Sequence, residues 1–193
     1  SGADTDISDV IVPMSTVLTH PSIKMSGAAV ETIVVAGNMD RAIGYIKATG
    51  GAITITGSGR LRLYVEGETS ISGTATMHIT PSPAGAPLAV EIYANGDVLL
   101  NSCVNQTGNA ANLGIFGTKN CKVVKYTGAS HFTGFMYVPY AAYDFSGQGD
   151  FLGAVVSGTI DVTGTGDFHY DEALTKKSMP FLLGYRILNW EEI

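Results

Sequence analysis

The chain repeats one pattern three times, as Gly128-Ala129-Ser130-His131-Phe132-Thr133-Gly134, Gly147-Gln148-Gly149-Asp150-Phe151-Leu152-Gly153 and Gly164-Thr165-Gly166-Asp167-Phe168-His169-Tyr170. The copies align Phe132, Phe151 and Phe168 at nearly equal steps along the sequence. A unit of this length is too small to bury its own apolar face, so it must stack on copies of itself. The repeat therefore predicts stacked parallel coils with the three rings in one column inside the protein.

A second short strand completes each unit. Tyr143-Asp144-Phe145 and Ile160-Asp161-Val162 are separated by one such step, which places Asp144 over Asp161. Crossovers between parallel strands are right-handed in nearly all proteins. We therefore predict an all-β fold, a right-handed parallel β-helix.

The first half of the chain follows the same plan with longer units. Apolar strands are expected around Arg62, Val90, Leu113 and Phe135. The extra residues fall in Pro- or Gly-rich stretches, 81–87 and 105–109, that are typical of loops. Because they are the longest insertions, a binding surface would most naturally grow there.

The two ends depart from the repeat within a single domain, residues 1–193. Residues 1–45 lack the pattern and are expected to form an N-terminal cap with a short helix around Met39 to Tyr45. The β-helix coils would then span residues 46–174. Residues 175–193, which include Trp190, are expected to be a tail packed on the last coils.

Composition agrees with this fold and excludes several functions. The 193 residues include 24 Gly and only 15% charged residues, a mixture that favours short strands and tight turns. A net charge of -6 argues against a nucleic-acid partner, because phosphates are bound by clustered Lys and Arg. No apolar run reaches the roughly 18 residues of a membrane span. The four histidines lack metal-ligand spacing, so no metal or cofactor is expected.

Several stretches resemble a known family, the most specific being Phe168-His169-Tyr170-Asp171-Glu172-Ala173-Leu174. Residues 132–139, 146–156 and 63–73 are similar as well. Over roughly residues 50–192 the chain resembles the C-terminal β-helix domain of bacterial type IV pilus-assembly and prepilin-like surface proteins. The resemblance implies a β-helix displayed outside the inner membrane, usually behind a prepilin-type hydrophobic helix. It brings no assigned catalytic residues with it.

Paired acids are the first candidate site. Asp144 and Asp161, one coil apart, would lie about 5 Å from each other, a separation that suits glycoside cleavage with retention of configuration. The apolar residues beside them are expected to take the core side. The acids would then face solvent, where they are solvated or form a weak cation site.

Tyrosines form the second candidate. Tyr140 and Tyr143 lie close to the acids in sequence, and three more tyrosines occur in apolar strands, at Tyr64, Tyr93 and Tyr137. If these rings stack on the outside, they would make an aromatic face for sugar rings or a partner protein. The alternative is half-buried tyrosines with the hydroxyl at the rim.

The two cysteines and two further acids have structural interpretations. The sequence separation of Cys103 and Cys121 is close to one unit of the repeat, so they could form a disulfide between neighbouring coils or remain two buried thiols. Asp150 and Asp167 occupy the Gly-x-Gly-Asp-Phe turn, where Asp commonly caps backbone N–H groups.

These features predict a non-enzymatic extracellular structural or binding module of a pilus- or envelope-associated bacterial surface protein, at the cell surface or in the periplasm. Its partners would be other pilus or envelope proteins or a surface glycan. The alternative is a carbohydrate-binding or carbohydrate-cleaving β-helix, which a cleft lined by convergent carboxylates would favour.

Overall fold

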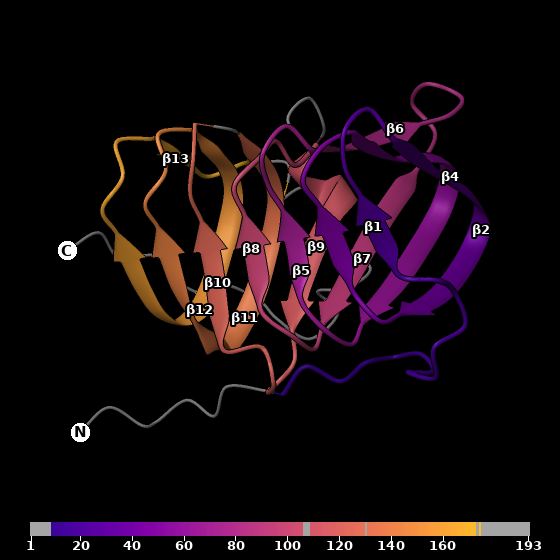
Figure 1. Cartoon of the computed structure of the whole chain (residues 1–193), viewed down its shortest axis with the longest axis horizontal. Coiled ribbons are helices and arrows are strands. Elements are labelled where there is room, and N and C mark those ends of the chain that lie inside the picture. Colours follow the sequence, from indigo (N-terminus) through magenta and orange to yellow (C-terminus); the bar gives the residue numbers. More distant parts are fainter. Residues whose placement is uncertain (1–8, 106–108, 130, 173, 175–193) are drawn as a thin grey trace.

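A computed structural model of the chain describes residues 9–105, 109–129, 131–172 and 174. They form a parallel β-solenoid of about six turns. In Figure 1 the chain rises along the front strands, descends along the rear strands and advances from β1 toward β13, which is a right-handed coil. The predicted fold class is therefore confirmed.

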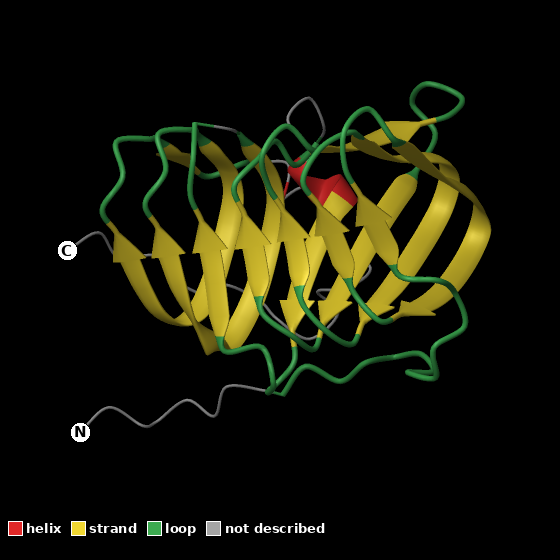
Figure 2. Ribbon diagram, viewed as in Figure 1, coloured by secondary structure: helices red, strands yellow, loops and turns green. Residues whose placement is uncertain are grey.

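One 13-stranded sheet winds around the core. Its strands are β1 (Ile23–Met25), β2 (Val30–Ile43), β3 (Ile46–Ala48), β4 (Ala52–Val65), β5 (Thr69–Ile71), β6 (Thr76–Pro81), β7 (Leu88–Ala94), β8 (Val98–Leu100), β9 (Leu113–Gly117), β10 (Val123–Tyr126), β11 (Phe132–Phe145), β12 (Phe151–Val162) and β13 (Phe168–His169). The 3-10 helix η1 (Ala110–Asn112), red in Figure 2, precedes β9.

The coils present three faces, because β2 and β4 each run along two of them and β11 and β12 run along all three. Face A comprises β1, β3, β5, β8, β10 and the C-terminal ends of β11 and β12. Face B comprises the first halves of β2 and β4, then β6, the starts of β11 and β12, and β13. Face C comprises the second halves of β2 and β4, then β7, β9 and the middle of β11 and β12.

The predicted phenylalanine column lies inside face B. Phe132 pairs with Phe151 and Phe151 with Phe168, and the successive ring centroids are 4.8 and 4.5 Å apart in stacked geometry. Phe132 and Phe151 are fully buried, whereas Phe168 in the last coil is 45% exposed. Stacked apolar side chains of this kind form the continuous core of a solenoid.

The predicted N-terminal cap is wrong from Ile23 onward. Strand β1 pairs with β3, and β2 pairs along its whole length with β4, so the solenoid begins before residue 46. The stretch expected to be helical, around Met39 to Tyr45, contains the end of β2. Two inward positions of β2 hold Glu31 and Arg41, which interrupt the apolar alternation by which a strand is recognised. The predicted tail, residues 175–193, lies outside the described residues.

Candidate functional site

Asp144 and Asp161 are paired in register on adjacent strands of face A. Tyr143 and Phe145, on either side of Asp144, are buried in the core, so Asp144 and its register partner Asp161 lie on the outer surface, as expected. Lys125 precedes Asp144 in the same outer column. Asp161 is exposed and Asp144 half-buried, which is the environment of solvated acids.

Tyr140 and Tyr143 do not join these acids in one site. Tyr143 is only 1% exposed, and its hydroxyl is buried without a hydrogen-bond partner among the described residues. Burial raises the pKa of Tyr143 far above its usual value. Tyr140 is 36% exposed, and its hydroxyl donates a hydrogen bond to Asp9. The alternation of the strand separates the two rings, one inward and one outward.

An aromatic column does form on the outside of face C. Tyr64, Tyr93, Phe116 and Tyr137 follow one another in register. All four are buried in a second apolar cluster, against which Val10, Val12 and Met14 of the N-terminal segment pack. The predicted aromatic face therefore exists, but its rings are covered and are not available to a sugar.

Polar contacts attach the N-terminal segment to face C. Arg62 donates two hydrogen bonds of 2.7 Å to the carboxylate of Asp40 and one of 2.9 Å to the backbone oxygen of Pro13. Beside it, the hydroxyl of Tyr93 donates to Glu91 at 2.8 Å. Burial, with the nearby Glu91 carboxylate, raises the pKa of Tyr93. Of these contacts, the hydrogen bond from Arg62 to Pro13 attaches the covering segment.

Cys103 and Cys121 are thiols in this structure. The coils in this region are longer than the sequence separation of the two cysteines, because Val98 pairs with Val124 and Val104 with Phe132. The two cysteines therefore lie at different corners of the coil. The suggested disulfide assumed the shorter repeat of the C-terminal half.

A shallow hollow of about 260 Å³ opens on face B beside the phenylalanine column. Its lining includes His131, Asp150 and His169. The Nδ1 atom of His131 accepts the N–H of Asp150 at 3.2 Å and lies 3.4 Å from the Asp150 carboxylate. Asp150 Oδ1 in turn accepts the N–H of Asp167 at 3.3 Å, the turn capping that the repeat predicted. The repeat aligns three of these residues in sequence, but sequence reasoning did not combine them into one site.

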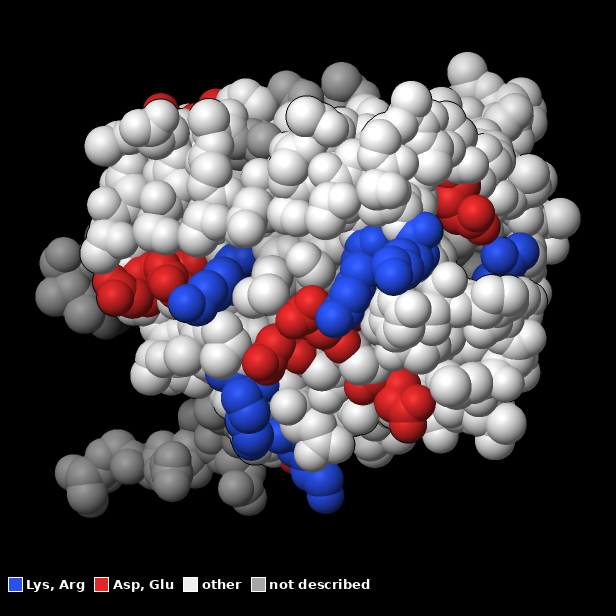
Figure 3. Space-filling view, in the orientation of Figure 1, with Lys and Arg blue, Asp and Glu red and all other residues white. Residues whose placement is uncertain are grey.

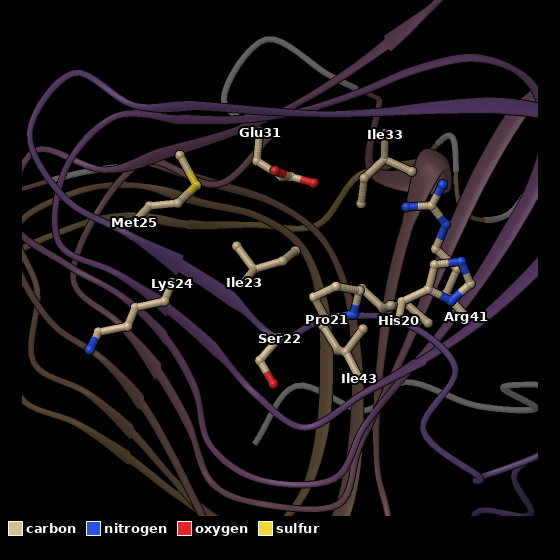
Figure 4. Close-up of a pocket in the computed structure, with 11 residues that line it drawn as sticks. His20, Pro21, Ser22, Ile23, Lys24, Met25, Glu31, Ile33, Arg41 and Ile43 are labelled. Carbon is tan, nitrogen blue, oxygen red and sulfur yellow. The ribbon is translucent and has the colours of Figure 1, made fainter.

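The open N-terminal end of the solenoid contains a second hollow, of about 230 Å³. Ile23, Ile33 and Ile43 form apolar walls, while Glu31 and Arg41 project from inward positions (Figure 4). The Nε atom of Arg41 is buried and has no hydrogen-bond partner in the part of the chain that the structure describes. Strand β1, which contributes to the wall, pairs with β3 and with no other described strand.

This end is the candidate functional site, because it combines apolar surface, two opposite charges and a strand edge that no other described strand pairs with. Such a combination suits contact with another protein chain. Sequence reasoning missed it by assigning the region to a cap. The signal that could have found it is the equal sequence spacing from Ile23 to Ile46 and from Ile46 to Thr69, which are partners on successive strands.

Two other kinds of site are absent from the described residues. No group of three or more His, Cys, Asp or Glu side chains there is placed to hold a metal ion. None of the described residues forms a helix with the length and apolar character of a membrane span.

Comparison with known families gives one match. The family described as Domain of unknown function (DUF7305) matches residues 76–177, more than half of the chain. The chain belongs to this family. No curated protein and no solved structure was found to match it. The DUF7305 match begins at β6, so it includes Asp144, Asp161 and the hollow on face B, whereas the N-terminal hollow precedes it.

Proposed function

We propose that this chain is a non-enzymatic structural or binding module of a pilus- or envelope-associated bacterial surface protein. The observation that carries this proposal is the unbroken register of face A. Side chains follow one another in continuous columns from β1 to the end of β12. Each coil is fixed by the coils above and below it, so the solenoid behaves as a rigid rod. A rod of this kind can hold its two ends at a constant separation within an assembly.

Two further features support a role in assembly. The residues that sequence reasoning considered for catalysis, Asp144 and Asp161, lie on an outer face beside Lys125. The hollow at the N-terminal end is bounded by an edge strand, and edge strands are natural sites for strand addition by a partner. The resemblance, over roughly residues 50–192, to type IV pilus-assembly and prepilin-like surface proteins supports a place in the bacterial envelope.

Surface labelling of intact cells tests this proposal. An epitope-tagged full-length protein in its own bacterium should react with a membrane-impermeant biotin reagent, and chemical crosslinking should join it to envelope or pilus proteins. A cytoplasmic protein of the same cells is the control and should remain unlabelled. Recovery of the tagged protein in the cytoplasmic fraction, unlabelled and uncrosslinked, would contradict the proposal.

A carbohydrate-directed function is the second candidate, and the register of Asp144 over Asp161 favours it. Adjacent strands lie about 4.8 Å apart, which is close to the separation of the two carboxyl groups in retaining glycosidases. A glycan array with the purified chain, followed by assays for reducing-sugar release from any glycan bound, tests this candidate. Release that is lost in both Asp144→Asn and Asp161→Asn would establish the enzyme and replace the structural proposal.

A further inference from the structure

Among the described residues, both ends of the solenoid have a strand on face A with one unpaired edge. Within the described residues, β1 pairs with β3 alone at one end, and the Ile160–Asp161–Val162 end of β12 pairs with β11 alone at the other. Figure 1 shows these two strands at opposite ends of the rod and pointing in the same direction. The unpaired N–H and C=O groups of each edge can therefore accept another parallel strand.

The apolar columns of face A reach both edges. Ile160 and Val162 continue the columns that begin at Ile23 and Met25. Ile160 is 56% exposed and Val162 is 54% exposed, although side chains in the same columns of the coil below are buried. At the opposite end, Ile23 and Met25 line the hollow of about 230 Å³. One end thus presents uncovered apolar side chains, and the other presents a space in the same columns.

The outer column between them has opposite charge at its two ends. It begins with Lys24 and Lys47 and ends with Asp144 and Asp161. Figure 3 shows basic side chains over β1 and the neighbouring strand, and acidic side chains over the end of β12. Lys24 and Asp161 are both exposed, and neither forms an ion pair with another described residue.

We propose that the edge of β12 in one copy pairs with the edge of β1 in a second copy, so that the chain associates head to tail. In this arrangement Ile160 stacks on Ile23, Asp161 faces Lys24, and Val162 stacks on Met25. The strand direction and the side-chain columns both continue across the junction. Because the two contacting surfaces differ, the contact does not close on itself and generates a linear assembly. This inference deepens the proposed structural function and rests on it.

Charge reversal tests the junction with the full-length chain in solution. The wild-type protein should show concentration-dependent oligomers by sedimentation velocity. Lys24→Asp gives acids at both ends of the column and Asp161→Lys gives lysines at both, so each variant alone should associate roughly tenfold more weakly. An equimolar mixture of the two variants restores opposite charges at every junction between unlike copies and should recover oligomers. The chain with both changes should recover them as well.

A matched control and two possible results decide the outcome. Lys119→Asp makes the same change of charge in a turn away from both ends, and it should sediment like the wild type. Circular dichroism of each variant checks that the β fold is intact. A wild-type chain that stays monomeric up to its solubility limit would overturn the proposal, as would a mixture that sediments like its separate components.

The result is distinguishable from a failure of the proposed function. A monomeric chain that is still labelled and crosslinked on the cell surface would refute head-to-tail association and leave the structural role intact. A chain that forms linear oligomers in solution but remains in the cytoplasm would do the reverse.

Discussion

The N-terminal and C-terminal halves of the solenoid build the same columns in different ways. On face B, the column runs through Ile53, Met77 and Val104 in the first half, where the coils are long. It continues through Phe132 and Phe151 in the second half, where the coils are short. Strands therefore stay in register from one coil to the next, although the number of residues in a coil varies. The interior side chains change from aliphatic groups to stacked rings along the way.

The largest expected effect is the loss of a ring from the short coils. Phe151 is fully buried and stacks on Phe132 on one side and Phe168 on the other. Phe151→Ala should lower the free energy of unfolding by about 3–5 kcal/mol, because it removes the ring and leaves a cavity. Urea denaturation followed by circular dichroism measures the change.

Two controls sharpen this comparison. Phe168→Ala should cost much less, since that ring is 45% exposed in the last coil. Ile55→Ala removes a buried aliphatic side chain from the long coils, and should cost about 2–5 kcal/mol. A Phe151→Ala cost no greater than that of Phe168→Ala would contradict the view that the ring column is the core of the C-terminal half.

The next effect concerns the distance between coils. Gly153 has a φ of +148°, and a Cβ atom there would lie 1.7 Å from the backbone oxygen of Gly134 in the coil below. Gly153→Ala should lower the free energy of unfolding by roughly 3 kcal/mol, because the coils must move apart. Gly37→Ala is the matched control in the first coil. No described atom lies within 4 Å of the Cβ atom that this change adds. Its only cost is the strain of an alanine at a φ of +71°. Thermal unfolding of the two variants should rank them in this order.

Two buried hydroxyls give a smaller effect of opposite sign. Thr69 and Tyr143 lie in the same inward column, one in each half, and neither hydroxyl has a hydrogen-bond partner within the described residues. Thr69→Val and Tyr143→Phe should each raise the free energy of unfolding by about 1 kcal/mol, because an unsatisfied buried polar group is removed. A loss of stability on either change in urea denaturation would show that the hydroxyl is satisfied in solution.

The smallest effect is a dependence on pH. Burial raises the pKa of Cys121 from the ordinary 9.0 to about 12, so the folded state holds the thiol proton more tightly than the unfolded state does. The stability from this group is present below about pH 9 and is lost as the pH rises toward 12. When the pH is raised from about 8 to about 10, the free energy of unfolding should therefore fall less in Cys121→Ala than in the wild type. The two falls should differ by up to about 1 kcal/mol. An equal fall in the two proteins would show that the Cys121 thiol is not the group responsible for the pH dependence.

The sequence supported those predictions that depend on residues recurring at nearly equal steps. Phe132, Phe151 and Phe168 recur at nearly equal steps, and Asp144 and Asp161 are one such step apart, so their stacking could be predicted. Alternation along the strand was enough to place the acids outside and Phe145 inside.

The remaining features depend on contacts between segments that no local pattern records. Glu31 and Arg41 prevent the first coil from being recognised in the sequence, because they place charged residues at inward positions of β2. Such residues are tolerated there because the core is open at this end. The outer tyrosines were expected to be exposed or half-buried, and their burial depends on where residues 10–14 pack. The cysteines were misplaced because the coil length near them differs from that of the repeat used to align them.

The tolerance of the columns to coil length has a practical consequence. Strand β6 ends at Pro81 and β7 begins at Leu88, and residues 82–85 between them are exposed at a corner of the rod. The strands on either side keep their register with β4 despite this insertion. A foreign peptide grafted at this corner should project sideways without disturbing the stack, so the protein could display short sequences at a fixed position along the solenoid.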